Sequence, residues 1–266
     1  MGSTELDAAG GRPLHDAVAI VTGGASGIGR ATAIGLASKG CSVAVVDIQA
    51  DAAEETAAAV RALGVRAISI GADLGNAEQV SKIVANSVSA LGRVDILVNC
   101  AGIYSGTSLL DLSIEEWERC HAVNLRSFFL LMQGAARVMI EQGDGGRIVN
   151  VSSSSAFRAR RVSPAYASSK SAILGLTRAA AGELGPFGIN VNAVAPGATA
   201  TPTAFNSLPR GREDLEAMVK GDGPASNLLG RLSEPEDAAD MIIFLCLPES
   251  RQITAQVMHV SAGAVV

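Results

Sequence analysis

The fold of this chain is decided by one stretch near its start, Ala17-Val-Ala-Ile-Val-Thr-Gly-Gly-Ala-Ser-Gly-Ile-Gly29. Its first five residues are apolar and rich in β-branched side chains, which predicts a buried strand. Gly23 permits a tight turn, and Gly27 and Gly29 let the backbone approach a pyrophosphate at the start of the helix predicted for residues 30–37. A strand, a glycine turn and a helix in this order are typical of a dinucleotide site. An ordinary glycine-rich turn is the alternative, and both flanking elements argue against it.

The rest of the chain repeats the alternation of strand and helix. Short apolar runs predict strands at 42–46, 66–70, 94–98, 147–151, 189–194 and 255–260. Helical patterns separate them at 50–63, 76–91, from 113 into 125–140, 164–184 and from 234 onward. This predicts an α/β fold with a single Rossmann-type doubly wound parallel sheet of about seven strands and helices on both faces. We assign residues 1–15 to a flexible tail, 16–266 to the dinucleotide-binding domain, and the irregular stretch 199–232 to a substrate lid.

Composition narrows the classes of function. The chain has 266 residues, of which 48% are hydrophobic and 18% charged, and its net charge is −5. These values suit one large domain with a buried core and give no indication of a partner such as a nucleic acid or a membrane surface. Four scattered cysteines fit no metal spacing, no apolar run reaches the length of a membrane helix, and the first 16 residues lack the apolar segment of a signal peptide. We therefore expect a cytoplasmic protein without a metal site.

A carboxylate at the end of the second strand bears on the choice of cofactor. Asp47 follows Gly29 by 18 residues, near the spacing of about 20 at which an acidic residue binds the adenosine ribose. The same carboxylate repels a 2′-phosphate, and neither Ser26 nor Ile48 supplies a cation for one. The sequence therefore favours NAD over NADP.

A second motif, Tyr166-Ala-Ser-Ser-Lys170, places a phenol and an ammonium four residues apart. In a helix this spacing puts both side chains on one face. A free tyrosine titrates near about 10, and a nearby cation lowers its pKa, so that the phenol can exchange a proton with a substrate oxygen. Ser153, after the strand at 147–151, could hydrogen-bond the same oxygen. A surface pair formed by chance is the alternative, and the dinucleotide motif argues against it.

Taken in order, these motifs resemble those of the short-chain dehydrogenase/reductase family in its compact single-domain form. Besides the glycine motif they are Asp47, Asp73, Asn99-Cys-Ala-Gly102, Asn124, Ser153, Tyr166-Ala-Ser-Ser-Lys170 and Pro196-Gly-Ala-Thr-Ala-Thr201. The resemblance covers about residues 15–263. It implies that Tyr166 is the general acid/base, that Lys170 holds the nicotinamide ribose and lowers the pKa of the tyrosine, that Ser153 orients the substrate carbonyl, and that Asn124 holds a water in a proton relay.

The resemblance also implies the cofactor contacts. Asp47 would bind the adenosine ribose, and Asp73 with Leu74 would flank the adenine. The segment 196–201 would bind the carboxamide end of the nicotinamide. The full set of expected cofactor-binding residues is Gly23, Ser26, Gly27, Ile28, Gly29, Asp47, Ile48, Asp73, Leu74, Asn99, Ala101, Gly102, Tyr166, Lys170, Pro196, Gly197, Thr199 and Thr201.

The chain departs from the family pattern in two places. Cys100 stands where relatives usually carry a second asparagine, and Gln-Val-Met-His-Val-Ser-Ala-Gly at 256–263 replaces the common Val-Asp-Gly-Gly ending. Serines at 152, 154 and 155 leave the choice of Ser153 open. The apolar helices at 125–140 and 169–184, together with the resemblance, predict a homotetramer.

Together these features predict an oxidoreductase that moves a hydride between NAD(H) and a secondary alcohol or ketone, a small-molecule substrate. One alternative is an NADPH-dependent 3-oxoacyl reductase, against which Asp47 argues. Another is a non-catalytic dinucleotide sensor, against which the four filled catalytic positions argue.

The substrate itself is only loosely constrained. The expected pocket is formed by 104–108, 156–162 and the lid. Arg158, Arg160 and Arg161 within it predict an anionic or strongly polar substrate. The alternative is that these arginines lie on a solvated face or form ion pairs.

Overall fold

A computed structural model describes residues 12–104, 106–158, 163–206, 208–223 and 225–265 of the chain. The strands are β1 (Val18–Thr22), β2 (Ser42–Asp47), β3 (Ala67–Gly71), β4 (Ile96–Asn99), β5 (Gly146–Val151), β6 (Ile189–Pro196) and β7 (Val257–Val260). They form one sheet in the order β3-β2-β1-β4-β5-β6-β7, and all of its pairs are parallel. The predicted fold class, a doubly wound parallel sheet of seven strands, is confirmed.

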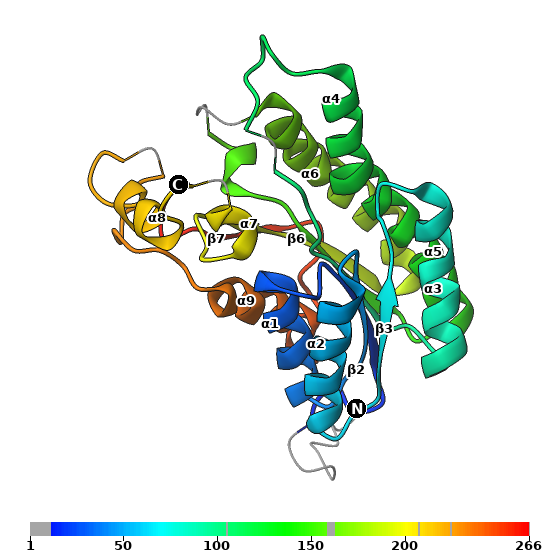
Figure 1. The fold of residues 1–266 in the computed structure, drawn as a ribbon. Coiled ribbons are helices and arrows are strands. Elements are labelled where there is room, and N and C mark those ends of the chain that lie inside the picture. The colour runs from blue at the N-terminus through cyan, green and yellow to red at the C-terminus, as the bar shows by residue number, and fades with distance from the viewer. Residues whose placement is uncertain (1–11, 105, 159–162, 207, 224, 266) are drawn as a thin grey trace.

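Helices cover both faces of the sheet (Figure 1). Their bounds are α1 (Gly27–Ser38), α2 (Ala50–Ala62), α3 (Ala77–Leu91), α4 (Ile114–His121), α5 (Ser127–Gln142), α6 (Pro164–Leu184), α7 (Pro202–Phe205), α8 (Arg212–Met218) and α9 (Pro235–Cys246). One buried cluster joins the sheet to α1, α2 and α9, and a second joins its other face to α3, α5 and α6. Because both faces are covered, β1 is buried along its whole length and reads as a continuous apolar run.

The order of the strands sets the place of a ligand site. From β1 the chain winds outward to β2 and β3, and then crosses to β4 on the other side of β1. The connections therefore diverge between the carboxyl ends of β1 and β4, and ligands of doubly wound sheets bind in the crevice at such a switch point. The glycine turn follows β1 at this place.

The ends of the elements follow capping chemistry. Asn76 begins α3 by accepting hydrogen bonds from the amides of Glu78 and Gln79. Pro164 occupies the first turn of α6, which runs to Leu184 as the sequence predicts. The last strand is shorter than expected, beginning at Val257, because Ala255 adopts a left-handed backbone conformation with φ 59°.

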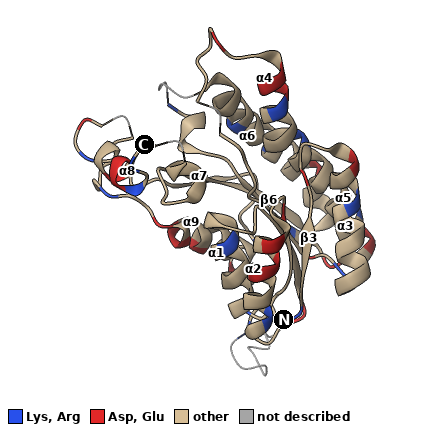
Figure 2. Ribbon diagram, viewed as in Figure 1, with Lys and Arg blue, Asp and Glu red and all other residues tan. Residues whose placement is uncertain are grey.

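The irregular stretch 199–232 holds two short helices, α7 and α8, beside the carboxyl ends of β6 and β7 (Figure 1). Acidic and basic residues occur along the helices, and α8 carries both signs (Figure 2). Within the part of the chain that the structure describes, no helix is long and apolar enough to cross a membrane, and no cluster of three or more His, Cys, Asp or Glu residues could hold a metal ion.

Candidate active site

The glycine turn between β1 and α1 is packed so closely that side chains cannot enter it. A Cβ at Gly23 would lie 2.9 Å from Cα of Ala101, and one at Gly29 would lie 2.1 Å from the carbonyl oxygen of Gly23. Gly27 has a φ of +53°, which favours glycine, and a Cβ there would come within 3.0 Å of Thr201. The turn thus brings bare backbone to the N-terminus of α1, whose first N–H groups lack partners inside the helix.

Around this turn the structure gathers several of the expected cofactor-binding residues. Ser26 is the residue before α1, and Ile28 is in its first turn. Asp47 accepts hydrogen bonds from the amides of Ala25, at 3.1 Å, and Gln49, at 3.0 Å. These bonds fix the carboxylate at the end of β2, beside the exposed side chain of Ile48.

Asp73 lies in the loop after β3 and is already bound within the chain. Arg119 of α4 donates to both carboxylate oxygens, at 2.9 and 3.0 Å, and the amide of Gly75 donates at 2.8 Å. The pKa of Asp73 is therefore held below its usual value, chiefly by the Arg119 hydrogen bonds, although partial burial works in the opposite direction. Its neighbour Leu74 is buried.

The segment after β4 is held by side chains from neighbouring strands. Thr22 Oγ1 accepts hydrogen bonds from the amides of Cys100, at 3.0 Å, and Ala101, at 3.2 Å. Asn99 donates to Asn150 of β5 at 2.9 Å. The turn that contains Cys100 is thus fixed through its backbone amides. Burial raises the pKa of this thiol to about 12.

Asn124 lies in a single turn of π-helix, Ala122–Arg126, that joins α4 to α5. Its side chain is fully buried and forms two hydrogen bonds with the backbone of Ile103. It accepts from the amide at 2.8 Å and donates to the carbonyl at 3.0 Å. It also donates to Ser169 Oγ at 3.1 Å. Because π-turns insert one residue and occur frequently at functional sites, this turn explains how a mid-helix asparagine reaches the loop after β4.

Lys170 lies on α6, as Tyr166 does, and is only 3% exposed. Its ammonium donates to the carbonyl oxygen of Val151 at 2.8 Å and lies 5.9 Å from the centre of the Tyr166 ring. A Cβ at Gly102 would come within 3.2 Å of the same nitrogen. Burial lowers the pKa of Lys170 to about 8.

Of the four consecutive serines, Ser153 is the one placed against the tyrosine. Its side chain hydrogen-bonds Tyr166, and its oxygen accepts from the amide of Ser155 at 3.1 Å. Ser152 is buried and donates instead to the carbonyl of Lys170 at 2.7 Å. The structure therefore brings Ser153, Tyr166, Lys170 and Asn124 together at the carboxyl edge of the sheet.

The pKa of Tyr166 differs from the sequence expectation. It is raised above the ordinary value, chiefly because the phenol is buried, and the hydrogen bond from Ser153 offsets this only in part. The expected lowering by Lys170 is not seen, because the ammonium bonds the Val151 carbonyl and its own pKa is depressed. At neutral pH the tyrosine carries its proton and can donate it.

The residues after β6 close the other side of the site. A Cβ at Gly197 would lie 2.9 Å from Cα of Ser261, so Pro196 and Gly197 lie against the end of β7. Thr199 is buried and donates to the Gly197 carbonyl at 3.1 Å. Thr201 begins α7 by accepting from the amide of Ala204 at 3.3 Å, and its methyl group faces Gly27.

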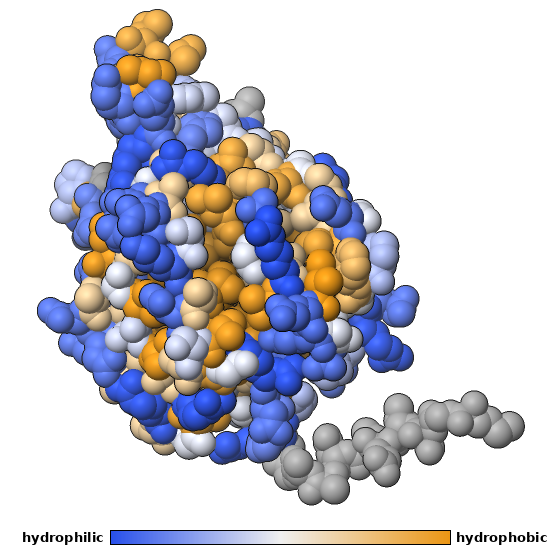
Figure 3. Space-filling model, turned by 90° about the vertical axis from the view of Figure 1, so that its right-hand side faces the viewer, coloured by the Kyte–Doolittle hydropathy of each residue, from blue (hydrophilic) through white to orange (hydrophobic). Residues whose placement is uncertain are grey.

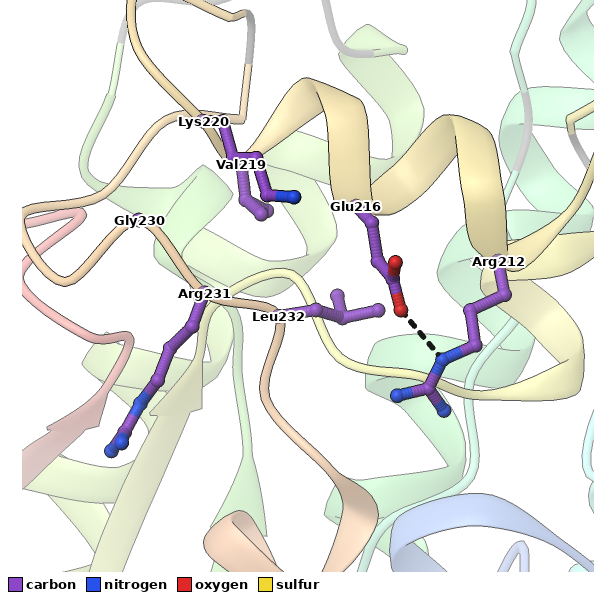
Figure 4. Close-up of a pocket in the computed structure, with 7 residues that line it drawn as sticks. All are labelled: Arg212, Glu216, Val219, Lys220, Gly230, Arg231 and Leu232. Atoms are coloured by element: carbon purple, nitrogen blue, oxygen red, sulfur yellow. Dashed lines mark hydrogen bonds and ion pairs between the residues drawn. The ribbon is translucent and has the colours of Figure 1, made fainter.

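A cavity of about 240 Å³ lies within residues 212–232, part of the stretch that the sequence predicts to be a lid, and Tyr166 does not line it. Figure 4 shows its lining, in which Arg212 bonds Glu216 while Arg231 points away from them. None of its lining residues is a predicted site residue. We therefore interpret it as a gap between α8 and residues 230–232.

The predicted arginine cluster is only partly described. The guanidinium of Arg158 donates to the carbonyl oxygen of Ser226 in the lid at 3.1 Å. Arg160 and Arg161 lie outside the described residues. The one arginine of this cluster that the structure describes is therefore hydrogen-bonded to the backbone of residue 226. The anionic substrate stays a prediction.

Sequence reasoning missed three polar residues that support the site. Thr22 fixes the turn after β4, Ser169 bonds Asn124, and Asn150 bonds Asn99. Asn150 had a usable signal, because it interrupts an otherwise apolar strand and a buried amide needs a partner. Thr22 and Ser169 had none, since hydroxyl side chains are common at strand ends and in helices.

Comparisons with known proteins agree with this geometry. A family model described as enoyl-(acyl carrier protein) reductase matches residues 23–265. The short-chain reductase protein NovJ of Streptomyces niveus is 41% identical over 249 residues, 94% of each chain. The (3R)-3-hydroxyacyl-CoA dehydrogenase of Mus musculus is 36% identical over 261 residues, 94% of this chain and 96% of that one.

The chain belongs to the short-chain dehydrogenase/reductase family. Solved structures of this oxidoreductase family match nearly the whole chain. A short-chain dehydrogenase from Mycobacterium paratuberculosis bound to NAD is 31% identical, with a TM-score of 0.84 over 95% of this chain and 98% of that one. One from Burkholderia cenocepacia J2315 in complex with NADP is 35% identical, with a TM-score of 0.86 over 95% and 99%. The two neighbours thus hold different nicotinamide dinucleotides.

Proposed function

We propose that this protein is an NAD-dependent dehydrogenase that interconverts a secondary alcohol and a ketone, with Tyr166 as general acid/base. One observation carries the proposal. Ser153, Tyr166, Lys170 and Asn124 converge at the carboxyl edge of the sheet, beside a glycine turn that excludes side chains. Membership of the family supports the reaction class.

The residues present fit a nicotinamide dinucleotide. Gly23, Gly27 and Gly29 leave the backbone bare at the N-terminus of α1, which suits a pyrophosphate. Asp47 would bind the adenosine ribose, and its charge would oppose a 2′-phosphate, so we propose NAD rather than NADP. Residues 196–201 would hold the nicotinamide end. When bound, this cofactor supplies or accepts the hydride.

The chain itself handles the proton. Tyr166 is protonated at neutral pH and donates to a carbonyl oxygen, or accepts the proton of an alcohol in the reverse direction. Ser153 hydrogen-bonds the same oxygen and orients it. Lys170, in contact with the Val151 carbonyl, would bind the ribose beside the phenol. Asn124 would hold a water of the proton relay through the backbone segment that it grips.

An acyl thioester is the second candidate substrate. The matching family model is described by reduction of an acyl-carrier substrate, and the mouse relative is named for a hydroxyacyl-CoA. Asp47 still argues against an NADPH-dependent 3-oxoacyl reductase, since that cofactor brings a 2′-phosphate.

We also propose a homotetramer. Figure 3 shows apolar side chains gathered between polar ones on the side of the molecule that is on the right in Figure 1. Phe129 and Ile140 on α5 remain 46% and 38% exposed, and a contiguous exposed apolar patch marks a surface for a partner. A monomeric mass by light scattering at micromolar concentration would contradict this assembly.

The cytoplasmic location stays a prediction.

The test of the reaction is a panel of secondary alcohols and ketones followed by NADH absorbance, with wild-type protein and Tyr166→Phe. We expect turnover by the wild type and a loss of about 10²–10⁴-fold in the variant, the range that a general acid/base contributes. Binding of NADH, measured by its fluorescence, should persist in Tyr166→Phe. Binding without turnover of any panel member by the wild type would favour the non-catalytic sensor.

A further inference from the structure

The two tyrosines of this chain meet at the proposed site. Aromatic residues make up only 3% of the sequence, and Tyr104 and Tyr166 are its only tyrosines. Their ring centres are 5.3 Å apart with an interplanar angle of 73°, an edge-to-face contact. Such a pair is stabilised by the ring quadrupoles beyond the area that it buries.

Tyr104 is held in place through the backbone that precedes it. Asn124 clamps both the amide and the carbonyl of Ile103, and Asn124 is itself fully buried. The ring of Tyr104 is therefore fixed at its backbone by Asn124 and at its edge by Tyr166. Binding to a ring so held costs little conformational entropy, which is what a recognition surface requires.

The packing leaves much of this ring uncovered. Tyr104 is 42% exposed, although it touches the tyrosine proposed as acid/base. A large side chain kept only for packing would normally be more deeply buried. A substrate oxygen bonded to the Tyr166 hydroxyl would bring the groups on its carbon beside the Tyr104 ring.

We propose that Tyr104 determines specificity, and that it selects alcohols and ketones with an aryl or similar planar apolar group on the reacting carbon. The inference rests on the proposed function, since it assumes that the substrate oxygen meets Tyr166. An aryl ring beside Tyr104 extends the existing edge-to-face pair to a third ring. A saturated ring of similar size fills the same space without the quadrupole interaction.

A purely structural role makes a different prediction. If Tyr104 only supports Tyr166, its replacement lowers the rates of all substrates by the same factor. If it contacts the substrate, the effect falls on aromatic substrates and spares small aliphatic ones.

The experiment compares 1-phenylethanol, 1-cyclohexylethanol and 2-butanol as substrates of wild type, Tyr104→Phe and Tyr104→Leu. We expect the wild type to prefer the phenyl over the cyclohexyl alcohol in kcat/KM by about fivefold, the scale of one aromatic pair. Tyr104→Phe should keep this ratio and Tyr104→Leu should reduce it to near one. Activity with 2-butanol should change less than about twofold, and NADH binding should be unchanged. The matched control is Phe187→Leu, at an exposed aromatic residue before the start of β6. It should alter neither the ratio of kcat/KM for the phenyl over the cyclohexyl alcohol nor the activity with 2-butanol.

The outcomes separate the two proposals. Equal wild-type rates with the phenyl and cyclohexyl alcohols, acceptance of aliphatic alcohols alone, or an equal loss on all three substrates in Tyr104→Leu would overturn the role of Tyr104 and leave the proposed function standing. Absence of wild-type turnover across the wider panel would refute the proposed function, and with it the inference. Thermal unfolding of each variant shows whether a loss reflects folding.

Discussion

The two halves of the carboxyl edge of the sheet are built differently. On the cofactor half, around β1, β2 and β4, the backbone itself forms the surface, and a Cβ at Gly23 or Gly29 would collide with neighbouring backbone. On the proposed substrate half, in the loops that lead from β4 to α4 and from β5 to α6, partly exposed side chains such as Tyr104 and Arg158 form the surface. The shape of the first half thus depends on positions that carry no side chain, and the shape of the second half depends on the side chains that are present.

This difference determines how each half responds to change. A close approach of backbone tolerates no added atoms, because close-packed neighbours cannot relax without moving strands. A surface of exposed side chains can lose one contact and keep its shape. The half built from bare backbone should therefore be the more easily disrupted by a substitution.

Gly29→Ala should have the largest effect. The added methyl group would lie 2.1 Å from the Gly23 carbonyl oxygen, so the turn must open. We expect NADH affinity to fall by more than about tenfold and unfolding free energy by about 1–3 kcal/mol, the usual cost of overpacking. NADH fluorescence titration and urea unfolding measure the two effects.

The control for that substitution is Gly182→Ala on α6, where a Cβ would meet nothing within 4 Å. There alanine should be neutral or stabilising by up to about 1 kcal/mol, because it favours the helix. If the two glycines tolerate alanine equally well, the cofactor half is not as tightly built as the distances indicate.

Lys170, at the junction of the two halves, should give the next largest effect, seen in the pH dependence of stability. Burial lowers its pKa from 10.5 to about 8 in the folded protein. Between these values the unfolded chain binds more protons at this residue, so this contribution to the unfolding free energy rises with pH from about 8 toward 10. Below pH 8 both states are protonated and the contribution is constant.

The measurement is urea unfolding of wild type and Lys170→Met at pH 7, 8.5 and 9.5. The unfolding free energy of the wild type minus that of the variant should be constant below pH 8 and should rise by about 1–2 kcal/mol by pH 9.5. The raised pKa of Tyr166 acts in the opposite sense, but only near and above pH 10. Parallel curves for the two proteins would show that Lys170 titrates normally.

The contrast between the halves also explains what the sequence could predict. The glycine motif, Asp47 and the Tyr166-to-Lys170 spacing report backbone geometry and helix faces, which follow from local sequence. The fold and the convergence of these residues were therefore predictable. The resemblance also located Asn124, whose place in a π-turn no helical pattern reveals.

The substrate half was predictable only as a region. Whether Arg158 meets a substrate or the carbonyl of Ser226 depends on where the chain places residue 226, a contact across 68 residues. The pairing of Tyr104 with Tyr166 likewise depends on the clamp between Asn124 and Ile103. The predicted lowering of the Tyr166 pKa is also wrong, because burial cannot be inferred from a four-residue spacing.

Asp47→Asn tests the side chain on which we propose that the choice of cofactor depends. Asparagine keeps the shape of the carboxylate and removes the charge that would face a 2′-phosphate. We expect the ratio of kcat/KM for NAD over NADP to fall by about tenfold, mainly through better use of NADP. Glu55→Gln, which removes an exposed charge from α2, should leave the ratio unchanged. A native protein that uses both cofactors equally would contradict the assignment of NAD.

Arg158→Gln should have the smallest effect, and it tests whether the substrate half contains an anion site. Because the guanidinium bonds the Ser226 carbonyl, its loss should loosen the lid for every substrate alike. We expect kcat/KM for an acidic substrate and for its neutral ester to fall together, by no more than about threefold, the scale of one hydrogen bond. Arg251→Gln, an exposed arginine before the start of β7, serves as the control. A loss confined to the acid would instead assign Arg158 to substrate binding, since a guanidinium that only fastens the lid cannot distinguish a carboxylate from its ester.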